Sequence, residues 1–251
     1  MTARFDIITL FPEIFAAVSD FGITARARKR GLWNVHFWNP RDVTTDLHRT
    51  VDERPFGGGP GMVMMADPLF RTLEHIRASG NQGRVIAFAP SARHLTDAKV
   101  RAFSSQEDLQ LVLICGRYEG IDQRFLDTCV DELISLGDFV LSGAELAACA
   151  LIDAVVRQLP GAIKDLSASD ESFSTGLLDA PHYTRPEEWH GMRVPDVLLT
   201  GHHANIEAWR REKSLETTLA SRPELIEKAR VEGRLNKHDE KFLKTLKAGG
   251  R

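Results

Sequence analysis

The stretch from residue 111 to residue 161 constrains the fold more than any other part of the chain. It opens with a continuous apolar run, Leu111 to Cys115, which ends in Gly116 and leads into the charged loop 117–122. A short apolar run that stops at a glycine is typical of a buried strand. Because ligand sites of open α/β sheets lie at the ends of such strands, we expect the loop after Gly116 to border a binding site.

The second half of this stretch predicts another loop of the same kind. Two short apolar segments, 133–136 and 139–141, flank the pair Gly137-Asp138. This pattern repeats the strand and glycine of the first half. Two glycine-bearing loops would then face one cleft.

A helix is expected to follow the second loop. Ser142 and Glu145 have the spacing of an N-terminal capping box, and an apolar run continues from residue 146 to residue 156. Gly143 leaves room for close backbone approach, so the N–H groups of the first helical turn would form a polar cradle beside the Gly116 loop. The alternative is two ordinary strand–helix units that bind nothing.

Strands and helices alternate along the first part of the chain. This alternation predicts an α/β fold with a mostly parallel sheet and helices on both faces. The expected strands are residues 5–10, 33–38, 84–88 and 111–115, and the expected helices include 21–30, 67–79, 96–104 and 146–156.

The character of the sequence changes after the first predicted domain, residues 1–161. Residues 162–175 are rich in serine and acidic side chains, which is typical of a flexible linker. The remainder, 176–251, is mostly helical in pattern, with breaks at Pro223 and Gly233. We therefore expect a small, all-helical C-terminal domain.

The net charge of −3 argues against a uniformly basic surface for nucleic acid, but the charge is unevenly distributed. Residues 202–251 contain 12 Lys and Arg against 8 Asp and Glu, whereas residues 1–201 contain 20 against 27. The C-terminal segment alone has a charge suited to a polyanion. A solvated helical face would have the same composition.

Cysteine and histidine spacing predicts neither a disulfide framework nor a metal site. Cys115, Cys129 and Cys149 are widely spaced in apolar sequence, and no C-x-x-C or H-E-x-x-H pattern occurs. The N-terminus lacks the apolar core of a signal peptide, and no run approaches the ~20 apolar residues of a membrane span. These features predict a cytoplasmic protein with reduced thiols.

A glycine-rich loop, Pro55 to Gly61, contains four glycines in five positions. It lacks the G-K-[ST] ending of a phosphate-binding P-loop, so the loop does not predict an ATPase. So many glycines indicate that the backbone there approaches something closely, whether a ligand, another loop or a second subunit.

Four motifs in register resemble one known family. They are ICGRYEGIDQR (114–124), ISLGDFVLSGAEL (134–146), DERPFGGGPGMVM (52–64) and GLLDAPHYTRP (176–186). Together they resemble the bacterial tRNA (guanine-N1)-methyltransferases, the TrmD type of the knotted SPOUT superfamily. The resemblance covers most of the chain, and it implies a deep trefoil knot, which the pattern of strands and helices alone does not predict.

The resemblance implies S-adenosylmethionine as cofactor, bound in the knot. One departure concerns Ala89, where the family often has serine, so a hydroxyl contact to the cofactor is lost there. The cofactor-binding residues implied by the resemblance are Phe88, Ala89, Pro90, Gly116, Tyr118, Glu119, Gly120, Leu136, Gly137, Asp138, Phe139, Val140, Leu141, Gly143 and Ala144.

The resemblance also implies the reaction, methylation of N1 of the guanine immediately 3′ of the tRNA anticodon. This chemistry needs a base for the N1 proton and a donor for the charge that gathers on O6. The family's arginine falls on Arg157, which the residues alone would explain as a cation at a helix C-terminus. The family's aspartate base falls on Glu171, with Asp170 as competitor if the linker shifts by one residue. Both acids could also be solubilising charges alone.

The substrate-binding residues implied by the resemblance are Gly58, Gly59 and Asp179. A carboxylate in a flexible linker needs a partner that fixes its position, and in the family a second subunit is that partner. A homodimer with an active site shared between subunits is therefore expected, with tRNA bound by the C-terminal domain.

The sequence bears on three alternative functions. A knotted RNA methyltransferase with another target base is disfavoured by the GGGPG loop and by the PHYTRP segment. A nicotinamide oxidoreductase would have G-x-G-x-x-G after the first strand, where Leu10-Phe11-Pro12-Glu13 stands instead. A non-catalytic RNA-binding module stays open, because the expected base and the residue at position 89 both differ from the family.

Overall fold

The computed structural model of this chain describes residues 2–163 and 171–249. The chain divides into two units, Met1–Lys164 and Asp165–Arg251, and each is described by itself. Asp170 lies outside the described residues.

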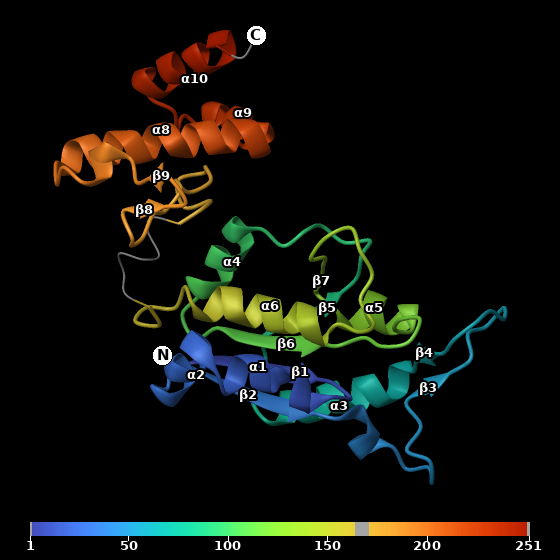
Figure 1. Cartoon of the computed structure of the whole chain (residues 1–251). Coiled ribbons are helices and arrows are strands. Elements are labelled where there is room, and N and C mark those ends of the chain that lie inside the picture. The colour runs from blue at the N-terminus through green and yellow to red at the C-terminus, as the bar shows by residue number, and fades with distance from the viewer. Residues whose placement is uncertain (1, 164–170, 250–251) are drawn as a thin grey trace. The chain divides into compact units, whose positions relative to one another are not determined.

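The first unit is built on a five-stranded sheet with strand order β2-β1-β6-β5-β7 (Figure 1). Every neighbouring pair in this sheet is parallel, as the sequence predicted. Its strands are β1 (Ala3–Ile8), β2 (Trp33–Trp38), β5 (Arg84–Phe88), β6 (Gln110–Ile114) and β7 (Glu132–Ile134).

Helices cover both faces of this sheet, which confirms the α/β class. Side chains of the central strand alternate between two cores, because successive residues of a strand point to opposite faces. Leu113 packs with helices α1, α2, α4 and α6, whereas Val112 packs with α3 and α5. The helices are α1 (Ala16–Ser19), α2 (Gly22–Lys29), α3 (Ala66–Ala78), α4 (Asp97–Ser104), α5 (Gln123–Cys129) and α6 (Glu145–Val156), with the 3₁₀ turns η1 (Pro12–Phe15) and η2 (Pro40–Val43).

The predicted capping box at the start of α6 is wrong. The helix begins at Glu145 itself, and its N-cap is Ala144, whose methyl group cannot accept a hydrogen bond. Ser142 therefore lies outside the helix. Glu145 is only 1% exposed and turns inward, away from the helix end.

The glycine-rich loop forms the end of a hairpin arm. Strands β3 (Asp52–Glu53) and β4 (Val63–Met64) pair antiparallel, and the loop joins them (Figure 1). Gly57, Gly58 and Gly59 all have positive φ, which explains why this turn uses glycine.

Between residues 171 and 249, the described part of the second unit, the helices are α8 (His203–Ser221), α9 (Pro223–Val231) and α10 (Lys237–Gly249). Pro223 begins α9, and Gly233 adopts a positive φ beyond its end, so both predicted breaks are confirmed. The core of this unit includes Leu177, Leu215 and Ile226.

The second unit is not purely helical. A short hairpin of β8 (Glu188–Trp189) and β9 (Met192–Arg193) precedes the 3₁₀ turn η3 (Asp196–Leu198), which corrects the all-helical expectation. Among the helices of residues 2–163 and 171–249, none is both long and apolar enough to cross a lipid bilayer.

Candidate active site

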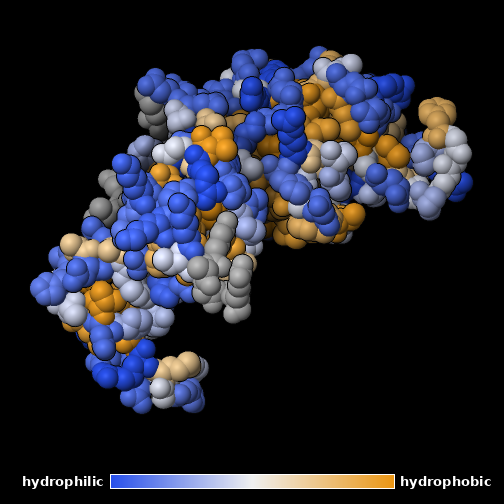
Figure 2. Space-filling view, turned by 90° about the horizontal axis from the view of Figure 1, so that it is seen from above, coloured by the Kyte–Doolittle hydropathy of each residue, from blue (hydrophilic) through white to orange (hydrophobic). Residues whose placement is uncertain are grey.

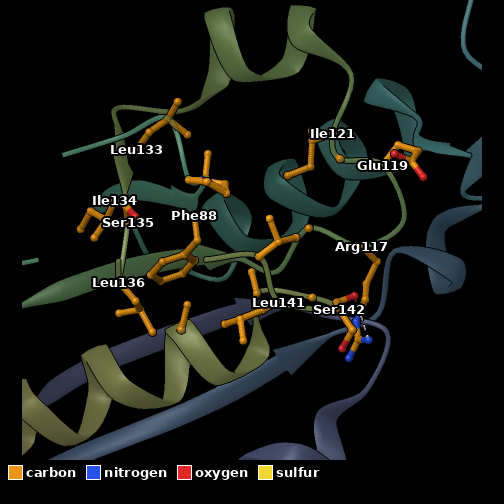
Figure 3. A pocket seen from close by; sticks show the side chains of 18 of the residues that line it. Phe88, Arg117, Glu119, Ile121, Leu133, Ile134, Ser135, Leu136, Leu141 and Ser142 are labelled. Atoms are coloured by element: carbon orange, nitrogen blue, oxygen red, sulfur yellow. Dashed lines mark hydrogen bonds between the residues drawn. The ribbon is translucent and has the colours of Figure 1, made fainter. Parts of the chain in front are cut away.

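A cavity of about 430 Å³ opens where three neighbouring strands of the sheet end (Figure 3). Phe88 is the last residue of β5, Gly116 lies just beyond β6, and Ser135 follows β7. Because these strands are parallel, their carboxyl ends meet at one edge of the sheet. The loops that follow them therefore converge on the cavity.

Fourteen of the fifteen predicted cofactor-binding residues line this cavity. The exception is Asp138, whose side chain is 89% exposed and whose Oδ1 lies 3.0 Å from Nε2 of His94. The remaining lining residues were not predicted to bind the cofactor: Arg117, Ile121, Gln123, Leu126, Leu133, Ile134, Ser135, Ser142 and Ala147.

The walls of the cavity differ in chemistry. Figure 3 shows Leu133, Ile134 and Leu136 gathered at one end, whereas Arg117 and Glu119 lie at the other. An apolar end with charged and backbone polar groups opposite suits a flat, partly polar ligand.

The two glycine-bearing loops are hydrogen-bonded to each other. The N–H of Ala144 donates to the carbonyl oxygen of Gly116 at 3.0 Å. Gly143 is needed because a Cβ there would stand 2.3 Å from Nε of Arg117. The close approach predicted for Gly143 is thus made by Arg117.

The base of the hairpin arm is hydrogen-bonded to the loop that follows Gly116. The N–H of Glu119 donates to the carbonyl oxygen of Met62 at 2.8 Å, and that of Met64 donates to Gly120 at 2.9 Å. A Cβ on Gly61 would stand 2.3 Å from Oε1 of Glu119, so glycine is needed here too. These contacts therefore join the hairpin arm to the cavity loop that follows Gly116.

Tyr118 is held in an uncommon conformation beside the cavity. Its φ of 61° lies in the left-handed region, which residues other than glycine seldom adopt. Nη2 of Arg41 lies 3.5 Å from its hydroxyl oxygen. Burial raises the pKa of Tyr118, and the nearby carboxylate of Asp52 raises that pKa further, so the phenol is protonated at neutral pH.

Ala89 lines the cavity although it lacks the hydroxyl group of a serine. The N–H of Ala89 donates to the carbonyl oxygen of Ile134 at 3.1 Å, which fixes the loop through its backbone. The segment after the neighbouring strand β7 places a hydroxyl in the cavity wall, Oγ of Ser135, which accepts from the N–H of Gly137 at 3.1 Å. The sequence gives no signal for Ser135 beyond its place within the apolar segment 133–136.

The rim of the cavity is apolar and open to solvent. Phe139 is 54% exposed, and Val140 is 85% exposed. Leu146, in the first turn of α6, is also exposed but does not line the cavity. Figure 2 shows hydrophobic residues gathered on a face of the first unit.

The predicted catalytic residues do not line this cavity within the first unit. Arg157 is the C-cap of α6, where its N–H donates to the carbonyl oxygen of Asp153. Glu171 belongs to the second unit, and its carbonyl oxygen accepts from the N–H of Ser174 at 3.1 Å. Asp170, the competing base, falls outside residues 2–163 and 171–249.

The predicted substrate-binding residues are also not among the residues of the first unit that line the cavity. Oδ2 of Asp179, in the second unit, lies 2.8 Å from Nε2 of His182. Gly58 and Gly59 are exposed in the loop of the hairpin arm. Beyond their chain neighbours, no atom of the described residues lies within 4 Å of the place where a Cβ would stand on either glycine.

Burial suppresses the ionisation of two cysteine thiols of the first unit. Burial raises the pKa of Cys115 well above its usual value, and it raises the pKa of Cys149 to about 11. The carboxylate of Glu145 contributes to both increases. Because a thiolate is the reactive species, neither thiol is suited to nucleophilic catalysis at neutral pH.

Comparison with known proteins gives consistent matches. Residues 3–228 match the family model of tRNA (Guanine-1)-methyltransferase TrmD. A tRNA (guanine-N(1)-)-methyltransferase of Burkholderia cenocepacia is 57% identical over 249 residues, which cover 97% of this chain and 94% of the relative. The enzymes of the same name from Burkholderia mallei and Burkholderia pseudomallei are each 55% identical over the same shares.

Proposed function

Because this chain belongs to the TrmD family of tRNA (guanine-N1)-methyltransferases, and is thus an enzyme that methylates tRNA, we propose that it modifies the guanine immediately 3′ of the anticodon, position 37. The methyl group would come from S-adenosylmethionine. The observation that carries this proposal is the cavity at the strand ends, where fourteen residues implied by the resemblance come together.

The cavity suits S-adenosylmethionine in size and chemistry. Its volume of about 430 Å³ falls within the ~300–1,000 Å³ typical of small-molecule sites. Leu133, Ile134 and Leu136 offer an apolar surface for an adenine ring. Glu119 offers a carboxylate to hydroxyl groups or to a positive charge. The bound cofactor supplies a methyl group on a positively charged sulfur, which is the electrophile.

Two side chains are proposed to act on the guanine. Glu171 would accept the N1 proton, so that the electron pair on N1 can attack the methyl carbon; the bond between that carbon and the sulfonium sulfur would break, and S-adenosylhomocysteine would leave. Arg157 would stabilise the negative charge that develops on O6. Register with the family motif supports Glu171, whereas Asp170 would serve if the linker shifts by one residue. Gly58, Gly59 and Asp179 would contact the tRNA.

A homodimer is the proposed working unit. Glu171 belongs to the second unit, and the rim of the cavity is apolar and exposed, so a second copy could cover the rim and bring its linker carboxylate to the guanine. We also expect a trefoil knot in the first unit, tRNA contacts in the second, and a cytoplasmic location. These expectations rest on family membership and on the basic balance of residues 202–251.

The test is transfer of labelled methyl from S-adenosylmethionine to unmodified tRNA, with Glu171→Gln and Asp170→Asn compared with the wild type. We expect Glu171→Gln to abolish transfer and Asp170→Asn to retain it. Loss in Asp170→Asn alone would move the base to Asp170. A folded wild type that binds both tRNA and cofactor without transfer would favour the non-catalytic RNA-binding module.

A further inference from the structure

One buried carboxylate lies behind both loops of the cavity, outside the residues that line it. Glu145 is 1% exposed, and its Oε1 accepts from Oγ1 of Thr9 at 3.1 Å and from Nε of Arg117 at 3.0 Å. Nη2 of Arg117 lies 2.9 Å from Oε2 of the same carboxylate. A charge buried this deeply is costly unless it is paired, and these contacts offset that cost.

The partners of this carboxylate come from separate parts of the chain. Thr9 follows β1, and its Oγ1 also accepts from the N–H of Phe11 at 2.9 Å. The ring of Phe11 packs 4.4 Å from Cζ of Arg117, a cation–π contact. Nη1 of Arg117 donates to the carbonyl oxygen of Ser142 at 3.3 Å. Glu145 thus joins the loop after β1, the loop after β6 and the segment before α6.

We infer that Glu145 is a positioning residue for the cofactor cavity, acting through Arg117. Arg117 lies between the two cavity loops: its own backbone belongs to the loop after Gly116, and its side chain packs on Gly143 and holds Ser142. The carboxylate of Glu145 fixes the guanidinium, and the guanidinium fixes both loops. The identity of the ligand, S-adenosylmethionine, rests on the function proposed above.

The alternative is that Glu145 and Arg117 are an ordinary buried ion pair that supports only the stability of the fold. The same unit contains a matched pair for comparison. Asp6 is fully buried, and its Oδ2 lies 2.6 Å from Nε of Arg4, with further hydrogen bonds from Trp38 and Asn81. Asp6 lies within β1 and does not line the cavity.

The experiment compares Glu145→Gln with Asp6→Asn in the full chain. Affinity for S-adenosylmethionine is measured by titration calorimetry, and hydrogen exchange is followed in the free protein at residues 116–120 and 141–144. Because small misplacements of a site cost up to about 100-fold, we expect Glu145→Gln to weaken binding by about 10- to 100-fold and to speed exchange in both loops. Asp6→Asn should leave affinity close to that of the wild type, because the partners of Asp6 lie outside the two cavity loops.

Kinetics add a readout that a stability effect would not produce. For Glu145→Gln, KM for S-adenosylmethionine should rise, while kcat at saturating cofactor stays close to that of the wild type. If Glu145→Gln does not fold, Thr9→Val removes one hydrogen bond to the carboxylate and should weaken cofactor binding by about three- to tenfold.

The outcomes separate this inference from the proposed function. Wild-type affinity and loop exchange in Glu145→Gln, or unchanged affinity in Thr9→Val, would overturn the positioning role and leave the methyltransferase intact. Equal loss of affinity in Asp6→Asn would also overturn it, because stability alone would then account for the effect. A wild type that does not bind S-adenosylmethionine would instead refute the proposed cofactor, while loop exchange in the free protein would still decide the role of Glu145.

Discussion

Replacing Gly143 by alanine should disturb the ion pair behind the cavity through a single added methyl group. The new Cβ would stand 2.3 Å from Nε of Arg117 and 2.6 Å from its Cζ. Contacts this short cannot exist, so the guanidinium must move away from Glu145. The backbone at Gly143 does not require a positive φ, so alanine adds a clash and little conformational strain.

The expected loss of stability follows from the burial of the pair. Glu145 has a side-chain exposure of 1% and Arg117 of 18%, and breaking a buried pair costs about 3–5 kcal/mol. Alanine in place of glycine returns about 0.4–1 kcal/mol by restricting the unfolded chain. The free energy of unfolding of the first unit should therefore fall by about 2–4 kcal/mol in Gly143→Ala.

Gly137→Ala is the matched control in the neighbouring loop. A Cβ there would stand 2.7 Å from the ring of Phe139, which is 54% exposed and can rotate into solvent. This variant should lose no more than about 1 kcal/mol, as at most surface positions. Urea denaturation and hydrogen exchange in α6 measure the stability of both variants. Equal stabilities of Gly143→Ala and Gly137→Ala would refute the reasoning about Arg117.

Three further predictions concern other parts of the chain. Burial would raise the pKa of Asp239, but hydrogen bonds from Arg211 and from the backbone of Asn236 outweigh it and lower that pKa. A lowered folded pKa stabilises the fold above the unfolded value of about 3.9, and this stabilisation is lost as pH falls through the folded pKa, so Asp239→Asn should flatten acid unfolding of the second unit below about pH 4. Leu215→Ala, at a fully buried position, should lower the free energy of unfolding of that unit by about 2–5 kcal/mol in urea titrations. At pH 8 the thiols of Cys115 and Cys149 should resist iodoacetamide until the protein is denatured, and rapid labelling of the folded protein would contradict the burial that raises their pKa values.

Local signals in the sequence predicted the regular elements of the fold well. The strand Trp33–Trp38 and the strand Arg84–Phe88 occur at the expected residues, because each is an apolar or alternating run bounded by turn residues. The helix expected from Thr96 is present, with Thr96 as its N-cap accepting from the N–H of Lys99. Capping and strand periodicity depend on residues that are close in sequence. Elements with these signals can therefore be predicted from the sequence alone.

The contacts of Glu145 show why other features were missed. Its spacing from Ser142 fits a capping box, but its carboxylate instead pairs with Arg117, 28 residues away, and with Thr9, 136 residues away. Only the folded sheet brings these side chains together. Tertiary pairing therefore overrides the local pattern, and it also explains Gly143, which makes room for Arg117.

For the same reason, some residues of the candidate site were predicted from the sequence and others were missed. Its glycines follow apolar strands and are visible in the sequence, whereas Leu126 and Ala147 reach the cavity from helices whose placement no local pattern gives. The hairpin of the second unit was missed because its strands have two residues each, too few to show alternation.

The most direct test of the central claim is to map the methylated nucleotide. Unmodified tRNA with guanine at position 37, and the same tRNA with adenine there, are incubated with the protein and S-adenosylmethionine, and the products are digested and sequenced by mass. The account predicts N1-methylguanosine at position 37 in the first tRNA and no methylation of the second. Methylation at another position, or equal transfer to both tRNAs, would contradict it.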